Sequence, residues 1–84
     1  MRAEQILPDA IDRADVNGVS VRKGTVAAFL ANARIYLEPA ASAAARDEAI
    51  RDLLEALPAL RALGIFDVVQ IRDEGLRAFV EAHH

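Results

Sequence analysis

The sequence predicts a small α+β domain in which a β-hairpin and a third strand form a small sheet packed by two to three helices. Three observations lead to this fold class. Asn17-Gly18 lies between valines at an expected hairpin turn, two apolar stripes at helical spacing follow it, and residues 65–72 are rich in β-branched and aromatic side chains. The chain has 84 residues, so we expect residues 1–84 to form a single domain.

The first thirteen residues are expected to lead into the hairpin. Residues 1–13 carry apolar side chains at helical spacing, but Pro8 disfavours helical geometry at Leu7, so we expect a short helical turn followed by a strand. Asn and Gly tolerate the positive φ that both central residues of a type I′ turn require, so Asn17-Gly18 predicts a hairpin. Apolar and polar residues alternate over residues 19–22, which predicts one buried and one exposed face.

Two longer helices are expected after the hairpin. Thr25 is predicted to cap the first by accepting a hydrogen bond from a later main-chain amide, and Pro39 to end it. Ser42 is the predicted cap of the second helix, Pro58 a break or kink within it, and Gly64 its left-handed C-cap. The apolar stripes are Val26, Phe29, Leu30, Ala33 and Leu37 in the first helix, and Ile50, Leu53, Leu54 and Leu57 in the second.

Residues 65–72, with the sequence IFDVVQIR, are predicted to form the third strand because of their β-branched and aromatic content. Both faces of this strand would be apolar, which is typical of a strand that is buried on two sides. After it, Asp73 is expected to cap a last helix whose apolar stripe contains Leu76, Phe79 and Val80.

This third-strand segment is also the candidate interface. Three strands in so small a chain do not readily cover two apolar faces, so we expect a homodimer, or contact with another polypeptide. An edge position in the sheet would favour docking, whereas a central position would bury the strand within one protomer, and the sequence leaves both possibilities open. The candidate interface residues are Phe66, Val68, Val69 and Ile71.

Residues 22–25 form a candidate anion-binding corner between the hairpin and the first helix. Main-chain N–H groups at the start of a helix, beside Arg22 and Lys23, are suited to a phosphate or a carboxylate. The corner lacks the full glycine-rich loop of a nucleotide-binding P-loop. In the purely structural interpretation, which is the more frequent one, Gly24 makes the turn, Thr25 caps the helix and the cations are solvated.

The composition limits which functions are plausible. Apolar residues make up 54% of the chain and aromatic residues 5%, so the core is expected to be aliphatic and rich in alanine. A domain of this size buries only about 60–65% of its unfolded surface, and self-association would add buried area. The chain has no cysteine, which excludes disulfides and thiolate metal sites. The formal net charge of −3 disfavours bulk electrostatic binding to nucleic acid.

Catalytic and metal-binding side chains are few. His83 and His84 are the only histidines, and with Glu81 they are candidate metal ligands, but no other imidazole or thiolate is present to complete a site. They stand at the end of the chain, where a His-His pair is either native or part of a tag. No histidine lies mid-chain to activate a hydroxyl, so we expect no enzyme, no metal and no cofactor.

The N-terminus lacks the basic-then-apolar pattern of a signal peptide, and no apolar run reaches the roughly 18–20 residues of a membrane span. We therefore expect a cytoplasmic protein with no membrane partner. The many arginines and alanines, with a single lysine, indicate a GC-rich bacterial genome.

Two runs, NGVSVRKGTVAAFLANARIYL and LPALRALGIFDVVQIR, resemble a family of small bacterial proteins of unknown function over residues 16–72. The resemblance implies a small standalone bacterial domain, and it implies no catalytic motif and no site residue. From the residues, the predicted function is a non-enzymatic, homodimeric protein-interaction module. The alternative is a module that binds an anionic ligand or nucleic acid at residues 22–25.

Overall fold

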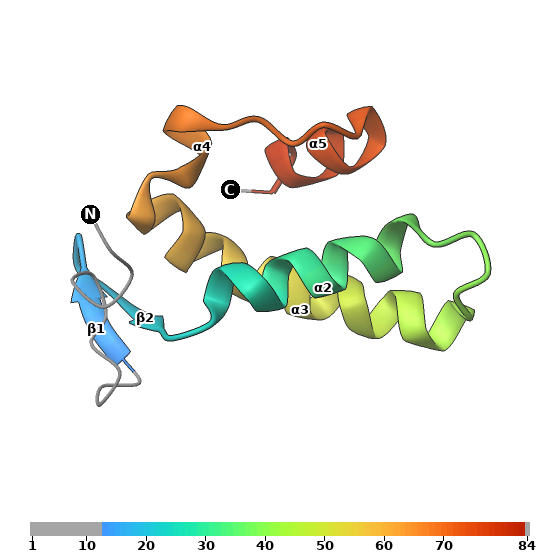
Figure 1. Ribbon diagram of the computed structural model, residues 1–84, viewed down its shortest axis with the longest axis horizontal. Coiled ribbons are helices and arrows are strands. Elements are labelled where there is room, and N and C mark those ends of the chain that lie inside the picture. Colours follow the sequence, from blue (N-terminus) through green and yellow to red (C-terminus); the bar gives the residue numbers. More distant parts are fainter. Residues whose placement is uncertain (1–12, 84) are drawn as a thin grey trace.

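The computed structural model describes residues 13–83. Its elements, in order, are β1 Arg13–Val16, β2 Val19–Arg22, α2 Thr25–Leu37, α3 Ala43–Leu63, α4 Ile65–Val68 and α5 Glu74–Glu81. Figure 1 shows α2 and α3 as an antiparallel pair, with the hairpin at one end and with α4 and α5 along one side. The helical turn predicted within residues 1–13 lies, apart from Arg13, outside the described residues.

The predicted hairpin is confirmed. Asn17 and Gly18 both have positive φ, 49° and 81°, as the tight turn requires. The two strands pair antiparallel, with Val16 opposite Val19 and Arg13 opposite Arg22. In β2 the side chain of Val21 is buried while its polar neighbours are exposed, so the predicted alternation is also confirmed.

The core lies between α2 and α3. Phe29 and Ala33 of α2 are buried against the buried face of α3, in which Leu53 and Leu60 have no exposed surface. Small residues at a helix contact allow the two axes to approach closely, and Ala33 is such a residue on α2. The core is therefore aliphatic, with Phe29 as the one buried aromatic side chain among the described residues.

The ends of α3 follow the prediction, whereas its interior does not. The Ser42 hydroxyl accepts a hydrogen bond from the Ala45 amide at 3.1 Å, and Gly64 ends the helix with a φ of 81°. The predicted break at Pro58 is wrong if taken as an end to the helix, because α3 continues through it to Leu63. Pro58 is exposed, so water can satisfy the carbonyl that loses its helical N–H partner.

The predicted cap of α2 by Thr25 is wrong. The N-cap is Gly24, with a φ of 87°, and no side chain caps the helix. Thr25 is instead the first helical residue, and its hydroxyl donates to the carbonyl of Arg22 at 2.6 Å. The glycine is required because a side chain rarely adopts this left-handed φ, and its turn directs the threonine hydroxyl back toward β2.

The predicted third strand is also wrong: in the described residues the sheet has two strands, and Ile65–Val68 forms the helical turn α4. The Val69 amide donates to the Ile65 carbonyl at 2.9 Å, so this backbone bonds within its own turn rather than to a neighbouring strand. Ile65 and Phe66 both pack against the core, which adjacent residues of a strand cannot do because their side chains point to opposite faces. Their β-propensity is outweighed by this packing.

The last helix agrees with the prediction. The Asp73 carboxylate accepts from the Leu76 amide at 2.9 Å and so caps α5. Leu76 and Val80 are buried, and Phe79 packs against the same core at its edge. An irregular linker, residues 69–73, therefore connects two short helices that are both held by the α2–α3 pair.

One side-chain hydrogen bond connects the hairpin turn to α3. The Asn17 amide nitrogen donates to the Ala62 carbonyl at 2.7 Å, across 45 residues of sequence. We expect Asn17→Gly to lower the free energy of unfolding by about 1 kcal/mol, because glycine keeps the positive φ but cannot make this bond. Asn17→Ala should cost roughly 1–2 kcal/mol more, since alanine also disfavours the left-handed conformation.

Urea unfolding of the two variants beside the wild type measures both effects. Equal stability of Asn17→Gly and the wild type would show that the bond to Ala62 contributes nothing to stability.

Candidate functional site

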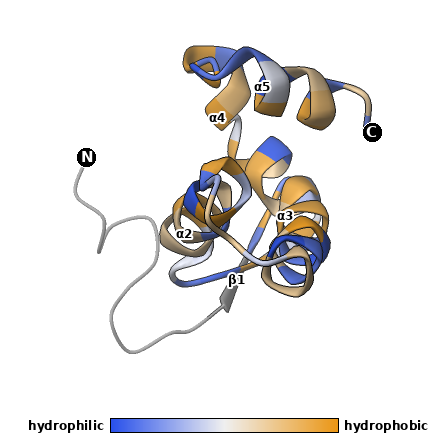
Figure 2. Cartoon of the chain, turned by 90° about the vertical axis from the view of Figure 1, so that its right-hand side faces the viewer, coloured by the Kyte–Doolittle hydropathy of each residue, from blue (hydrophilic) through white to orange (hydrophobic). Residues whose placement is uncertain are grey.

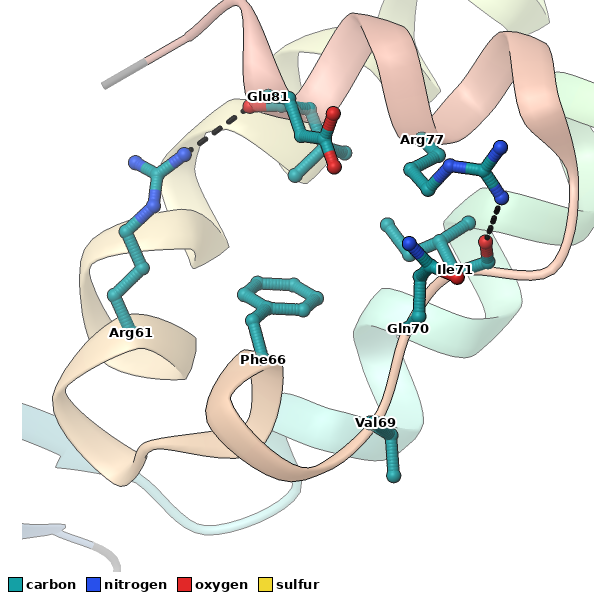
Figure 3. Close-up of a pocket in the computed structure, with 8 residues that line it drawn as sticks. Arg61, Phe66, Val69, Gln70, Ile71, Arg77 and Glu81 are labelled. Atoms are coloured by element: carbon teal, nitrogen blue, oxygen red, sulfur yellow. Dashed lines mark hydrogen bonds between the residues drawn. The ribbon is translucent and has the colours of Figure 1, made fainter.

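The candidate site is a surface cavity of about 340 Å³ at the place where α3 ends and α4, the linker and α5 come together (Figure 3). Three of the four candidate interface residues, Phe66, Val69 and Ile71, line it. Val68, the fourth, does not. The remaining lining residues are Arg61, Gln70, Arg77, Val80 and Glu81.

The apolar wall of the cavity is held in place by the core. The ring of Phe66 meets the ring of Phe29 edge-on, with centroids 6.3 Å apart, so its orientation is set from α2. Ile71 is half-buried and packs against the same core, and Val80 is almost fully buried. Figure 3 shows the Phe66 ring between Arg61 and Ile71, facing the space below α5.

Two guanidinium groups flank this apolar wall. Arg77 donates to the carbonyl of Ile71 at 3.0 Å, which ties the linker to α5. Arg61 donates to the carbonyls of Val80 and His83 and so caps the C-terminal end of α5. A guanidinium carries five N–H donors, so each group is oriented by main-chain oxygens and still has donors to offer. Glu81 is the one acid among the lining residues, so the wall carries a net positive charge.

Beside the cavity lie the two most exposed large apolar side chains of the described residues, Val68 at 86% and Val69 at 51%. We call them the valine pair. Val68 projects from the end of α4, and Val69 begins the linker and lines the cavity edge. The candidate interface residues therefore divide into two that pack on the core, Phe66 and Ile71, and two that face outward.

A second uncovered apolar surface runs along α2. Val26, Leu30 and Leu37 are 38%, 50% and 44% exposed, and their spacing of four and seven residues places them on one side of the helix. We call these three residues the outer face of α2. The sequence grouped them in one stripe with Phe29 and Ala33, but only the latter two enter the core. Figure 2 shows α3 on one side of α2, and among the described residues no helix lies on its other side.

A sequence signal for this outer face exists. Within α2 the single charged residue is Arg34, so the helix is apolar over more of its circumference than one partner helix covers. A stripe of five apolar residues together with this lack of charge indicates a helix with two contacts rather than one.

The anion-binding corner is less suited to an anion than its sequence indicates. Arg22 and Thr25 line a separate cavity of about 370 Å³, but Asp52 and Glu55 of α3 line it too. Lys23 and Gly24 are exposed beside it. The sequence does not place these two carboxylates at the corner, because they lie about thirty residues away along the chain and reach it only through the packing of α3 on the hairpin and α2.

The C-terminal histidine packs against its own helix. The ring of His83 lies 4.4 Å from the ring of Phe79, and its Nδ1 is 2.7 Å from the Phe79 carbonyl oxygen. His84 lies outside the described residues. Within residues 13–83, no three His, Asp or Glu side chains gather as a potential metal site. None of the helices in this range has both the length and the apolar character needed to cross a membrane.

Comparison with known proteins finds no match to this chain among family models, curated proteins or solved structures. Function is therefore inferred from the residues and their geometry.

The two carboxylates at the corner generate a prediction about phosphate. We expect inorganic phosphate to shift the backbone amide resonances of Thr25 and Val26 only weakly in the wild type. The double substitution Asp52→Asn, Glu55→Gln should strengthen this binding about fivefold, because it removes two nearby negative charges. An NMR titration measures it, with Glu74→Gln on α5 as the control. Saturable millimolar binding by the wild type would instead support the anion site.

Proposed function

We propose that this chain is a non-enzymatic protein-interaction module that works as a homodimer. The observation that carries the proposal is the outer face of α2, where three large apolar side chains remain between 38% and 50% exposed. Isolated exposed apolar residues are common on protein surfaces, whereas an aligned set along one helix is typical of a contact surface.

The outer face is suited to contact with itself. In an antiparallel pair of α2 helices related by a two-fold axis, Val26 of one copy lies near Leu37 of the other, and Leu30 lies near the axis. Ala27 and Ala31 are exposed beside these residues, and their small size lets two helices approach closely. Such a contact uses the same surface on both copies and closes as a dimer.

The size of the contact limits its strength. A helix of 13 residues is about 20 Å long, so two α2 helices packed lengthwise cover less than the ~800 Å² per partner of a standard interface. We therefore expect a dimer that dissociates on dilution through the micromolar range.

The valine pair is assigned to a different role. It belongs to α4 and the linker rather than to α2, and Val68 is the most exposed large apolar side chain among the described residues. We assign the valine pair to contact with a partner protein. Its position at an irregular segment between two helices is typical of binding surfaces, which are often carried by loops on a rigid scaffold.

Two observations favour this proposal over the anion-binding alternative. The corner at Arg22 faces two carboxylates, and the net charge of −3 opposes general attraction of phosphate or nucleic acid. The non-enzymatic part rests on the sequence, which has no histidine mid-chain to activate a hydroxyl.

The dimer contact is tested by charge placed on the outer face. We expect Leu30→Glu to raise the dimer dissociation constant at least tenfold, because two carboxylates would lie near the two-fold axis. Ile35→Glu is the matched control: Ile35 is 37% exposed on the same helix but lies on another side of it. Light scattering across a dilution series gives the mass relative to twice 9.1 kDa. A wild type that is monomeric at high concentration would refute the dimer.

The separate role of the valine pair is tested in the same assay. We expect Val68→Asp to leave both the dimer mass and the thermal unfolding temperature unchanged, because Val68 is 86% exposed and lies outside the α2 contact. If Val68→Asp yields monomers while Leu30→Glu does not, the segment 65–71 joins the two copies and the outer face of α2 does not.

A further inference from the structure

We infer that the cavity between α4 and α5 binds a small carboxylic acid with an apolar tail. The inference concerns a ligand site within one protomer, so it goes beyond the proposed function and does not depend on the homodimer. It rests on three properties of the cavity: its size, its apolar wall and the arrangement of charge around it.

The size of the cavity suits a small molecule. Its volume of about 340 Å³ lies at the lower end of the range of roughly 300–1,000 Å³ that is typical of ligand pockets. A space of this size accommodates a tail of about five to eight carbon atoms with one polar head, and not a folded partner.

The wall supplies an apolar surface for the tail. Phe66, Ile71 and Val80 are each held by core packing, so the surface exists before a ligand arrives. Val69 is 51% exposed at the edge of the cavity, and a bound tail would cover part of it. Removing apolar area from water is the main source of affinity for such a tail.

The charges select the head group. Arg61 and Arg77 approach the cavity from opposite sides, and each is oriented by a hydrogen bond to a main-chain carbonyl (Figure 3). The planar guanidinium matches a carboxylate with two parallel hydrogen bonds. Arg77 is half-buried, so we assign it as the main partner of the carboxylate, with Arg61 more exposed on the other side.

Glu81 restricts the charge of the ligand. Two arginines and one glutamate give the wall a formal charge of +1, which complements a monoanion better than a phosphate dianion or a dicarboxylate. The Gln70 amide adds a neutral donor at the same wall. Because Glu81 repels a bound carboxylate, removing its negative charge should strengthen binding in the cavity. A carboxylate that only pairs with Arg61 or Arg77 outside the cavity would not show this gain in affinity.

The test is an NMR titration of the full chain with sodium hexanoate, with acetate and 1-hexanol as matched probes that lack the tail and the carboxylate respectively. We expect saturable shifts of the Phe66, Val69 and Ile71 amides with hexanoate, and binding at least tenfold weaker for both controls. If 1-hexanol binds as tightly as hexanoate, the cavity recognises only the apolar tail. If acetate binds as tightly as hexanoate, the carboxylate only forms ion pairs at the surface. If no saturable shift is seen, the cavity does not bind the ligand. Each of these results overturns the inference.

Two variants and one peptide complete the experiment. Glu81→Gln should tighten hexanoate binding several-fold, with Glu74→Gln on the same helix as the unaffected control. Arg77→Gln should weaken it at least tenfold; if that variant does not fold, Glu81→Gln alone decides, and unchanged affinity there overturns the inference. A peptide ending in a free leucine carboxylate that binds more than tenfold tighter than hexanoate would also overturn it, because the site would then recognise polypeptide ends.

Discussion

The packing of α2 against α3 is the contact on which the other elements depend. Leu53, Leu57 and Leu60 present one fully buried face, and Phe29 and Ala33 fill it from α2. The hairpin is joined to the start of α2 through Gly24 and bonded to α3 through Asn17, while α4 and α5 add Phe66, Leu76 and Val80 to the same cluster. Each peripheral element therefore reaches its place by attaching to this one helix pair.

A single helix pair cannot cover the apolar surface that this chain carries. α2 faces α3 on one side only, so Val26, Leu30 and Leu37 remain in contact with water. The chain after Gly64 meets the same limit: α4 buries Ile65 and Phe66 in part and leaves Val68 exposed. The two candidate contact surfaces and the cavity beside α5 share this origin, since each lies where the small core stops covering its own apolar residues.

Local interactions account for the parts of the fold that were predicted correctly. The turn and cap residues act through backbone groups only a few positions away, so the sequence predicts their roles. These residues are Asn17, Gly18, Ser42, Gly64 and Asp73. The predicted cap at Thr25 is wrong because Gly24 occupies the N-cap position and the Thr25 hydroxyl donates to the Arg22 carbonyl instead of accepting from a helix amide. The strand predicted for residues 65–72 is wrong because a strand is stabilised by pairing with another strand. Here Ile65 and Phe66 instead pack side by side on the same core, which requires a helical turn.

The sequence by itself determined the hairpin, the caps of α3 and α5 and the excess of apolar residues, because turn geometry and capping are local. Only the tertiary structure decided which apolar residues are covered. It separated Phe29 from Leu30, converted a strand-like segment into a helical turn, placed Asp52 and Glu55 beside Arg22, and brought Arg61 and Arg77 to one cavity. These outcomes depend on contacts between residues far apart in the chain. Whether a side chain is buried is decided by the residues that pack around it, and the sequence next to it does not specify them.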